Sequence, residues 1–325
     1  MEQNIRFCTT EDGVRIAYAT TGKGSPIVRP GHWLTHLEYD LKSPVWGHLL
    51  EGLSQQHMLV RYDPRGTGLS DRDVDTVSAE LWLKDIEAVV DDLRLDKFVV
   101  LGVSQGGATA VRYAAKHPDR VSHLILYGAF ARGRVRPEML DAMCTLMRQG
   151  WGSDNAAYRE LFSASYVGSG NRKHIGFLND LEKVSATPEM AAKYLRVNAT
   201  VDVRDLLPQV KAPTLVMHCL GDRAVKFKYG RELASGIAGA KFVPMDGTNH
   251  LFLEGEPAEK TFFEEVGRFL GDKPRLIRRG VLKRQARGFH SATERLYHMI
   301  APYYMVIAVT SALIAAASFV IAKLG

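Results

Sequence analysis

Three side chains of this sequence have the types that nucleophilic catalysis needs, and they occur in the order serine, aspartate, histidine. Ser104 lies at the centre of Gly102-Val-Ser-Gln-Gly106, Asp222 follows an apolar run, and His250 ends a later loop. A serine hydroxyl is a weak nucleophile at neutral pH, so an imidazole must accept its proton and a carboxylate must orient that imidazole. We interpret Ser104 as the nucleophile, His250 as its general base and Asp222 as the orienting acid.

Ser104 is placed between a predicted strand and a predicted helix. Phe98 to Leu101 is an apolar run typical of a strand buried on both faces, and Ala108 to His117 is alanine-rich and stops at Pro118. A G-x-S-x-G turn between such elements holds the serine hydroxyl clear of the backbone. The helix N-terminus then points at Ser104, and the Gln105 N–H is free to bind a developing oxyanion.

A second oxyanion donor is expected from the loop after an earlier strand. Residues 26–29 are a short apolar strand that leads into Pro30-Gly-His-Trp33. The donor is the backbone N–H of His32 or of Trp33, and the sequence does not choose between them. His32 and His36 are also spaced like a pair of metal ligands, but no third ligand follows at metal spacing, so we predict no metal site.

Two residues compete with the predicted base and acid. His218 is an alternative base, although its place inside an apolar strand is more typical of a core residue. Asp246 is an alternative acid, but it precedes His250 by only four residues on one short loop, which is a poor position for orienting the ring. We therefore favour His250 and Asp222.

The segment from Asp63 to Asp71 is rich in glycine and proline, which marks a structured turn. We predict that Arg65 and Asp71 form a structural ion pair that shapes it. Ser70 lies in the same turn, but it lacks a strand before it and a helix after it, so it is a weak alternative nucleophile.

Strands and helices alternate along most of the chain, which indicates the α/β class. Further strands are predicted at 57–62, 121–127, 213–218 and 241–245, with helices at 79–93 and 257–270. Residues 131–205 interrupt this alternation with four predicted helices, near 136–149, 154–165, 171–184 and 188–199. We expect this insertion to form a helical lid over Ser104, and its aromatic and methionine side chains are candidates to line an apolar pocket.

Composition and the N-terminal sequence argue against a disulfide-rich, a zinc-binding and a secreted protein. The chain has 325 residues, of which 46% are hydrophobic and 24% charged. Its three cysteines form no C-x-x-C pair, so we expect neither a disulfide framework nor a zinc site, and a reducing compartment fits best. The N-terminus lacks the pattern of a signal peptide.

The C-terminal part has a different character. Residues 273–295 hold eight basic residues and one acidic residue and so carry a charge of +7, which leaves −1 for the rest of a chain whose net charge is +6. The basic character is therefore local, and a general nucleic-acid-binding surface is not indicated. Residues 303–322 are mostly apolar and number about the 20 that a membrane span needs. We predict a catalytic domain at 1–272, a basic juxtamembrane segment at 273–296 and a transmembrane helix at 297–325. Positive charge before the span predicts that the catalytic domain faces the cytoplasm.

Over residues 5–271 the chain resembles the α/β-hydrolase fold enzymes. The resemblance rests on Gly102-Val-Ser-Gln-Gly106, Asp63-Pro-Arg-Gly-Thr-Gly-Leu-Ser-Asp71, Gly221-Asp222 and Asn249-His250. It implies a mostly parallel eight-stranded sheet, an acyl-serine intermediate and no cofactor. One departure is Pro30-Gly31, where the family commonly has His-Gly before the oxyanion loop.

Three further stretches resemble a bacterial branch of this family, whose members are often joined to adenylate/guanylate cyclase domains or to DNA-binding regulator domains. These stretches are His32-Trp-Leu-Thr-His-Leu-Glu-Tyr-Asp40, Ser43-Pro-Val-Trp46 and Leu124-Ile-Leu-Tyr-Gly128. The C-terminal part contains neither kind of output domain and departs from that branch in having a basic segment and a predicted span.

Together these patterns predict a membrane-tethered serine hydrolase. Its substrate is expected to be a small or lipophilic ester or lactone, cleaved through the triad and an acyl-enzyme as in carboxylesterases and lactonases. The alternative is a ligand-sensing signalling module with little or no turnover, which the branch's fusion to output domains suggests.

Overall fold

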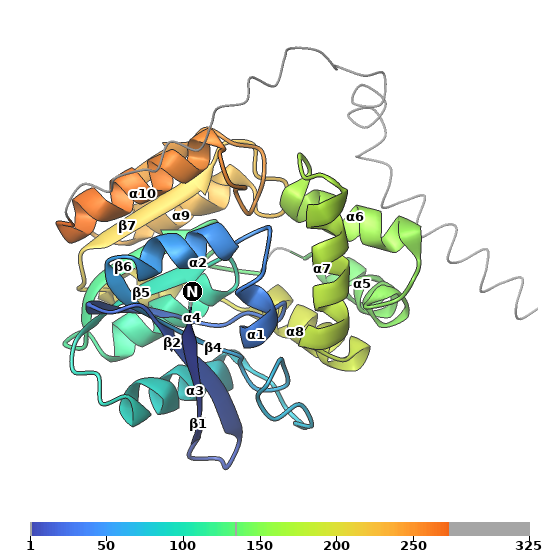
Figure 1. The fold of residues 1–325 in the computed structure, drawn as a ribbon, viewed down its shortest axis with the longest axis horizontal. Coiled ribbons are helices and arrows are strands. Elements are labelled where there is room, and N and C mark those ends of the chain that lie inside the picture. Colours follow the sequence, from blue (N-terminus) through green and yellow to red (C-terminus); the bar gives the residue numbers. More distant parts are fainter. Residues whose placement is uncertain (1, 134, 273–325) are drawn as a thin grey trace, which may run out of the picture. The chain divides into compact units, whose positions relative to one another are not determined.

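The computed structural model describes residues 2–133 and 135–272, in which helices cover both faces of an eight-stranded sheet (Figure 1). The strands are β1 (Gln3–Thr9), β2 (Arg15–Thr21), β3 (Ser25–Arg29), β4 (His57–Tyr62), β5 (Phe98–Val103), β6 (Val121–Tyr127), β7 (Thr214–Cys219) and β8 (Lys241–Met245). Their order across the sheet is β1-β2-β4-β3-β5-β6-β7-β8. β2 pairs antiparallel with β1 and with β4. The six strands β4, β3, β5, β6, β7 and β8, in their order across the sheet, pair in parallel. The predicted eight-stranded, mostly parallel sheet is confirmed.

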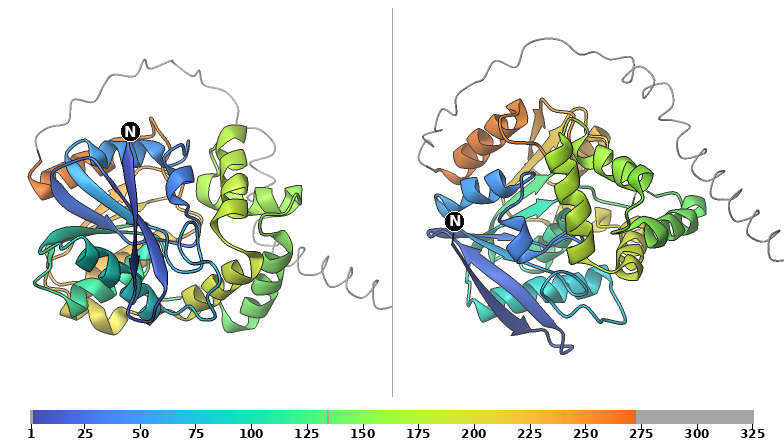
Figure 2. Two further views of the ribbon diagram at one scale, coloured as in Figure 1. Left: turned by 60° about the horizontal axis from the view of Figure 1, so that its bottom comes forward. Right: turned by 45° about the vertical axis from the view of Figure 1, so that its right-hand side comes forward.

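Helices flank the sheet in two layers (Figure 2). One face is covered by α2 (Gly47–Ser54) and α10 (Pro257–Leu270), and the other by α3 (Ala79–Asp92), α4 (Gly106–Lys116) and α9 (Phe227–Gly236). Every residue of the central strand β5 is buried, as expected for a parallel strand between two helix layers. Because β5, β6 and β7 pair in parallel, their carboxyl ends come together at one edge of the sheet.

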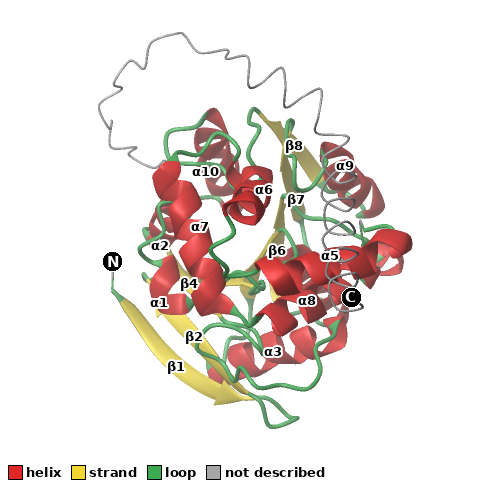
Figure 3. Cartoon of the chain, turned by 90° about the vertical axis from the view of Figure 1, so that its right-hand side faces the viewer, coloured by secondary structure: helices red, strands yellow, loops and turns green. Residues whose placement is uncertain are grey.

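The interruption of the strand–helix alternation corresponds to a group of helices beside the sheet (Figure 3). These helices are α5 (Pro137–Gly150), α6 (Ala156–Val167), α7 (Arg172–Ser185) and α8 (Pro188–Thr200). All four predicted helices are confirmed, with ends within two residues of those expected. An isolated antiparallel bridge pairs Arg132 with Asp202, so the insertion leaves and rejoins the body at one place. We call this insertion the lid. The remaining short elements are α1 (Leu37–Asp40) and the 3₁₀ helix Arg204–Gln209.

The predicted juxtamembrane segment, 273–296, and the predicted span, 297–325, lie outside the described residues. Within 2–133 and 135–272, no helix combines the length and the apolar composition that crossing a bilayer requires.

The predicted ion pair between Arg65 and Asp71 is wrong. Arg65 is buried and binds two other carboxylates, Asp12 at 2.6 Å and Asp85 at 2.7 Å. Asp71 lies 3.5 Å from Arg15 instead. Arg65 thus ties its turn to the β1–β2 hairpin and to α3, two elements that the chain folds back to meet. Spacing within the turn therefore could not identify its partners.

Asp63, at the start of the same turn, carries a fully buried carboxyl group. Its oxygens accept the backbone N–H groups of Leu37 at 3.1 Å and Leu69 at 2.9 Å. The Thr35 hydroxyl lies 3.0 Å from an oxygen of Asp63 and 3.0 Å from an oxygen of Asp40. A hydroxyl has a single proton and can donate to only one of two carboxylates. Burial and the charge of Asp40 raise the pKa of Asp63 from 3.8 to about 7, so a protonated Asp63 resolves this conflict.

We expect Asp63→Asn to flatten the dependence of stability on pH. The folded-state pKa of Asp63 is raised, so between about pH 4 and pH 7 the folded protein binds more protons than the unfolded chain. This group's contribution to the free energy of unfolding therefore falls as the pH rises, by on the order of 2 kcal/mol between about pH 5 and pH 8. An asparagine amide mimics the protonated carboxyl and does not titrate. Urea unfolding of the wild type and of Asp63→Asn at these two pH values tests this prediction. An equal change in the free energy of unfolding with pH in both proteins would contradict it.

Candidate active site

Ser104 stands at the sharp turn between β5 and α4. Its φ of +51° is unusual for a residue with a side chain, and it is one of two such non-glycine residues in the described chain. The Ser104 N–H donates to the Tyr127 carbonyl at 2.9 Å, which holds the turn against the end of β6. Strain of this kind persists only where surrounding structure imposes it, and it is frequent at functional sites. The side chain is only partly buried and so can be reached from outside.

Two glycines of the G-x-S-x-G motif permit close approach of neighbouring backbone. A Cβ atom on Gly102 would lie 2.7 Å from the Cα of Gly107 on α4, and one on Gly106 would lie 2.9 Å from the Pro30 carbonyl oxygen. The first glycine lets α4 turn back tightly on β5. The second lets the loop after β3 approach the start of α4, so that the predicted oxyanion loop borders the nucleophile turn.

His250 and Asp222 form a buried pair beyond the ends of β8 and β7. His250 Nδ1 lies 2.7 Å from Asp222 Oδ2, and both side chains are about 1% exposed. The other carboxylate oxygen accepts the Val225 N–H at 2.8 Å. Burial alone would raise the pKa of Asp222, but the charge of His250 and the hydrogen bonds from His218, His250 and Val225 outweigh it, so the pKa lies well below its usual range. Asp222 is therefore ionised at neutral pH and able to orient the imidazole.

Ser104 and His250 both lie against the Tyr127–Gly128 peptide. The Tyr127 carbonyl binds the Ser104 amide, and a Cβ atom on Gly128 would lie 3.0 Å from His250 Cε1. Gly128 has a φ of +57°, so both its conformation and the nearby ring favour a residue without a side chain. The three residues of the predicted triad are thus gathered at one edge of the sheet.

The Nε2 atom of His250 is buried and has no hydrogen-bond partner among the described residues. No hydrogen bond to Ser104 Oγ is therefore present. Contacts between nucleophile and base are often long in the absence of substrate and tighten in the Michaelis complex. With Nδ1 bound to Asp222, Nε2 is the nitrogen that remains to accept a proton.

Neither the alternative base nor the alternative acid takes the place of His250 or Asp222 in this pair. His218 Nε2 donates to the Val225 carbonyl at 2.7 Å and also lies 3.3 Å from Asp222 Oδ2. His218 is fully buried on β7, as its apolar surroundings predicted, but its contact with the acid was not foreseen. Asp246 is exposed, and Asp222 is the carboxylate bound to His250.

The loop after β3 brings Trp33 to the start of α4. The Trp33 N–H faces the side chain of Gln105, whose Oε1 lies 3.4 Å away. Gln105 occupies the N-cap position of α4, and its side chain makes no capping hydrogen bond to the helix. A backbone donor on the loop and the helix N-terminus that follows Ser104 therefore face the same space.

His32, the other candidate on this loop, has a side chain committed to Arg29. The Arg29 guanidinium donates to His32 Nε2 at 2.7 Å, and both residues are buried. Burial, followed by the charges of Arg29 and His250, holds the pKa of His32 far below its usual value. The ring is therefore neutral and accepts through Nε2. Within the described residues, no group of three His, Cys, Asp or Glu side chains has the arrangement of a metal site.

The lid contributes aromatic side chains to this edge of the sheet. Trp33 stacks on Trp151 at 5.0 Å between ring centroids and meets Phe162 edge-on at 6.1 Å. Phe162 contacts Tyr166, whose ring lies 5.7 Å from that of His250. The Tyr166 carbonyl also accepts the His250 N–H at 3.0 Å, so α6 holds the histidine loop directly. An aromatic run thus connects the oxyanion loop to the predicted base.

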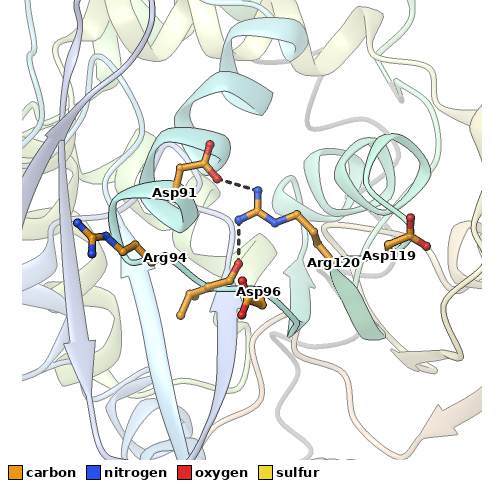
Figure 4. Close-up of a pocket in the computed structure, with 6 residues that line it drawn as sticks. Asp91, Arg94, Asp96, Asp119 and Arg120 are labelled. Carbon is orange, nitrogen blue, oxygen red and sulfur yellow. Dashed lines mark hydrogen bonds and ion pairs between the residues drawn. The ribbon is translucent and has the colours of Figure 1, made fainter.

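A separate hollow of about 450 Å³ lies at the opposite edge of the sheet (Figure 4). It is bordered by residues just before β5 and β6, where Arg120 binds Asp91 at 2.7 Å and the Leu95 carbonyl at 2.8 Å. It is therefore remote from Ser104. The lining residues are Asp91, Arg94, Leu95, Asp96, Asp119 and Arg120.

The sheet order, the nucleophile turn and the acid–histidine pair define the class of protein. The chain belongs to the alpha/beta hydrolase family, whose model matches residues 28–262.

Individual relatives share about a quarter to a third of their residues with it. It is 28% identical over 263 residues to the AB hydrolase superfamily protein YisY of Bacillus subtilis, an alignment covering 75% of this chain and 91% of the relative. It is 31% identical over 212 residues to the pimeloyl-[acyl-carrier protein] methyl ester esterase of Nitrosomonas europaea, covering 62% of this chain and 79% of that protein.

Among solved structures, the fold resembles the enol-lactonase of Burkholderia xenovorans, with a TM-score of 0.70 and 24% identity. That comparison covers 82% of this chain and all of the lactonase. Membership of this family identifies the chain as a hydrolase.

Proposed function

We propose that this protein is a serine hydrolase that cleaves a small or lipophilic ester or lactone through Ser104, His250 and Asp222. The observation that carries the proposal is the ionised Asp222, bound to His250 beside the strained Ser104 turn. These are the three groups that acyl transfer requires, in the chain order of this family.

The reaction proceeds through a covalent intermediate. Ser104 Oγ attacks the carbonyl carbon while His250 Nε2 takes its proton, and Asp222 stabilises the imidazolium that forms. The backbone N–H groups of Gln105 and Trp33 bind the oxyanion, which takes the place of Gln105 Oε1 as partner of the Trp33 amide. The intermediate collapses when His250 returns the proton to the leaving alcohol. Water then hydrolyses the acyl-serine by the same route in reverse, with His250 again as base.

The lid supports a lipophilic rather than a highly polar substrate. Phe162 and Tyr166 are each partly exposed and lie between Trp33 and His250. Aromatic surfaces of this kind favour contact with apolar acyl or alcohol groups. The methyl ester esterase among the relatives supports the ester class.

The test of this function is labelling with a fluorescent fluorophosphonate, which reacts with activated serines. We expect the full-length protein to label and Ser104→Ala not to label. Absence of labelling in folded wild-type protein would contradict the proposal. It would favour the ligand-sensing module, which the resemblance to the branch with output domains suggests.

We also propose that the chain is anchored in a membrane by residues 297–325, with the hydrolase domain facing the cytoplasm. The support is the uncharged apolar run at 303–322 and the basic segment that precedes it. We expect the full chain to remain in the membrane pellet after high salt and alkaline carbonate washes, and residues 1–272 alone to stay in the supernatant. Release of the full chain by salt would indicate surface binding through the basic segment and would refute the span.

A further inference from the structure

Tyr127, the last residue of β6, contacts both the nucleophile turn and the histidine loop. Its carbonyl accepts the Ser104 N–H at 2.9 Å, and its hydroxyl donates to the His250 carbonyl at 2.5 Å. The same hydroxyl accepts the Phe252 N–H at 3.3 Å and lies 3.9 Å from Cys219 Sγ. One residue thus binds the backbone on both sides of the expected proton transfer.

The direction of the Tyr127 hydroxyl is set by packing. The side chain is 1% exposed, and its ring lies 5.3 Å from Phe252 and 5.7 Å from Phe262 on α10. Burial raises the pKa of Tyr127 well above its ordinary value, so the hydroxyl keeps its proton and remains a donor. The His250 carbonyl therefore has a rigid partner on the sheet side.

The lid holds the same loop from the opposite side. The Tyr166 carbonyl accepts the N–H groups of His250 at 3.0 Å and of Leu251 at 3.2 Å. Removing the Tyr127 hydroxyl would leave the His250 backbone bound to the lid and its ring bound to Asp222, but without the contact that fixes the loop against β6, and the imidazole could then shift relative to Ser104. A displacement of about 1 Å at a reacting group is enough to slow a reaction by about 100-fold.

We infer that Tyr127 is a positioning residue that sets the distance between Ser104 and His250 by binding the backbone of both. This inference rests on the proposed serine hydrolase function. It assigns Tyr127 no contact with substrate, so its effect is expected on the chemical step and not on substrate binding.

The test compares Tyr127→Phe with Tyr113→Phe in ester hydrolysis. Phenylalanine keeps the ring packing and removes only the hydroxyl. Tyr113 on α4 is a matched control, because it is also fully buried but its hydroxyl has no hydrogen-bond partner among the described residues. For Tyr127→Phe we expect kcat per folded molecule to fall by about 10- to 100-fold, with KM changed by less than about threefold. For Tyr113→Phe both constants should stay near those of the wild type.

A purely structural role predicts a different result. In that case Tyr127→Phe would lower the melting temperature, but its kcat per folded molecule would equal that of Tyr113→Phe. This outcome would overturn the inference.

If Tyr127→Phe does not fold, Phe262→Leu replaces it, because it loosens the packing around the Tyr127 ring and retains the hydroxyl. An unchanged kcat in folded Phe262→Leu would equally overturn the inference, and a fall in kcat at constant KM would support it. Ser104→Ala in the same assay reports on the proposed function alone.

Discussion

Ser104→Ala is expected to lower kcat for ester hydrolysis by on the order of 10⁴-fold or more, because no other group can form the acyl intermediate. The Gln105 and Trp33 amides remain in place, so a residual acceleration of roughly 10³-fold over water should persist. KM should change little, since the lid and the oxyanion loop are untouched. Steady-state kinetics on a chromogenic ester measure both constants.

The matched control for this substitution is Ser70→Ala. Ser70 accepts the Ala17 N–H at 2.8 Å and donates to the Asp63 carbonyl, so its hydroxyl is buried in the turn after β4. Its loss should reduce the free energy of unfolding by about 1–3 kcal/mol and leave kcat per folded molecule unchanged. Activity of Ser104→Ala within about tenfold of the wild type would rule out Ser104 as the nucleophile, and a loss in Ser70→Ala alone would identify the other serine.

Asp222→Asn is expected to reduce kcat by roughly 10⁴-fold while keeping the fold. The carboxylate of the wild type accepts the Val225 N–H and the His250 Nδ1–H, and His218 Nε2 lies 3.3 Å from the oxygen that binds His250. An asparagine oxygen directed at the Val225 N–H turns its amide nitrogen toward both imidazoles. That nitrogen would donate to His250 Nδ1, which forces the proton onto Nε2 and removes the acceptor for Ser104. The asparagine NH₂ group would also face the N–H of His218, and two donors that face each other cannot form a hydrogen bond.

Asp246→Asn makes the same chemical change on the histidine loop and serves as the control. Asp246 is exposed, so its kcat and stability should remain close to those of the wild type. Steady-state kinetics of both variants with one ester provide the comparison. A larger loss of kcat in Asp246→Asn than in Asp222→Asn would reverse the assignment of the acid.

The elements that carry the site were predictable because they depend on local patterns. The apolar run before Ser104 and the alanine-rich stretch after it predicted the turn, and the structure places β5 and α4 there. The lid helices were found within two residues because their periodicity and their bounding prolines and glycines act over a few residues. The sequence also restricted the acid to Asp222 or Asp246 and the base to His250 or His218.

The pairings between these elements were decided by the tertiary structure. Asp222 meets His250 across 28 residues, and Tyr127 meets His250 across 123. Such contacts arise because β5, β6, β7 and β8 lie side by side and bring their carboxyl ends to one edge. The partners of Arg65, Asp12 and Asp85, lie 53 and 20 residues away, and they were missed because the fold brings the β1–β2 hairpin and α3 against the turn after β4. The sequence by itself determined which side chains could do chemistry and which elements carry them. The order of strands in the sheet decided which of them meet, because that order is a property of the whole chain and of no single segment.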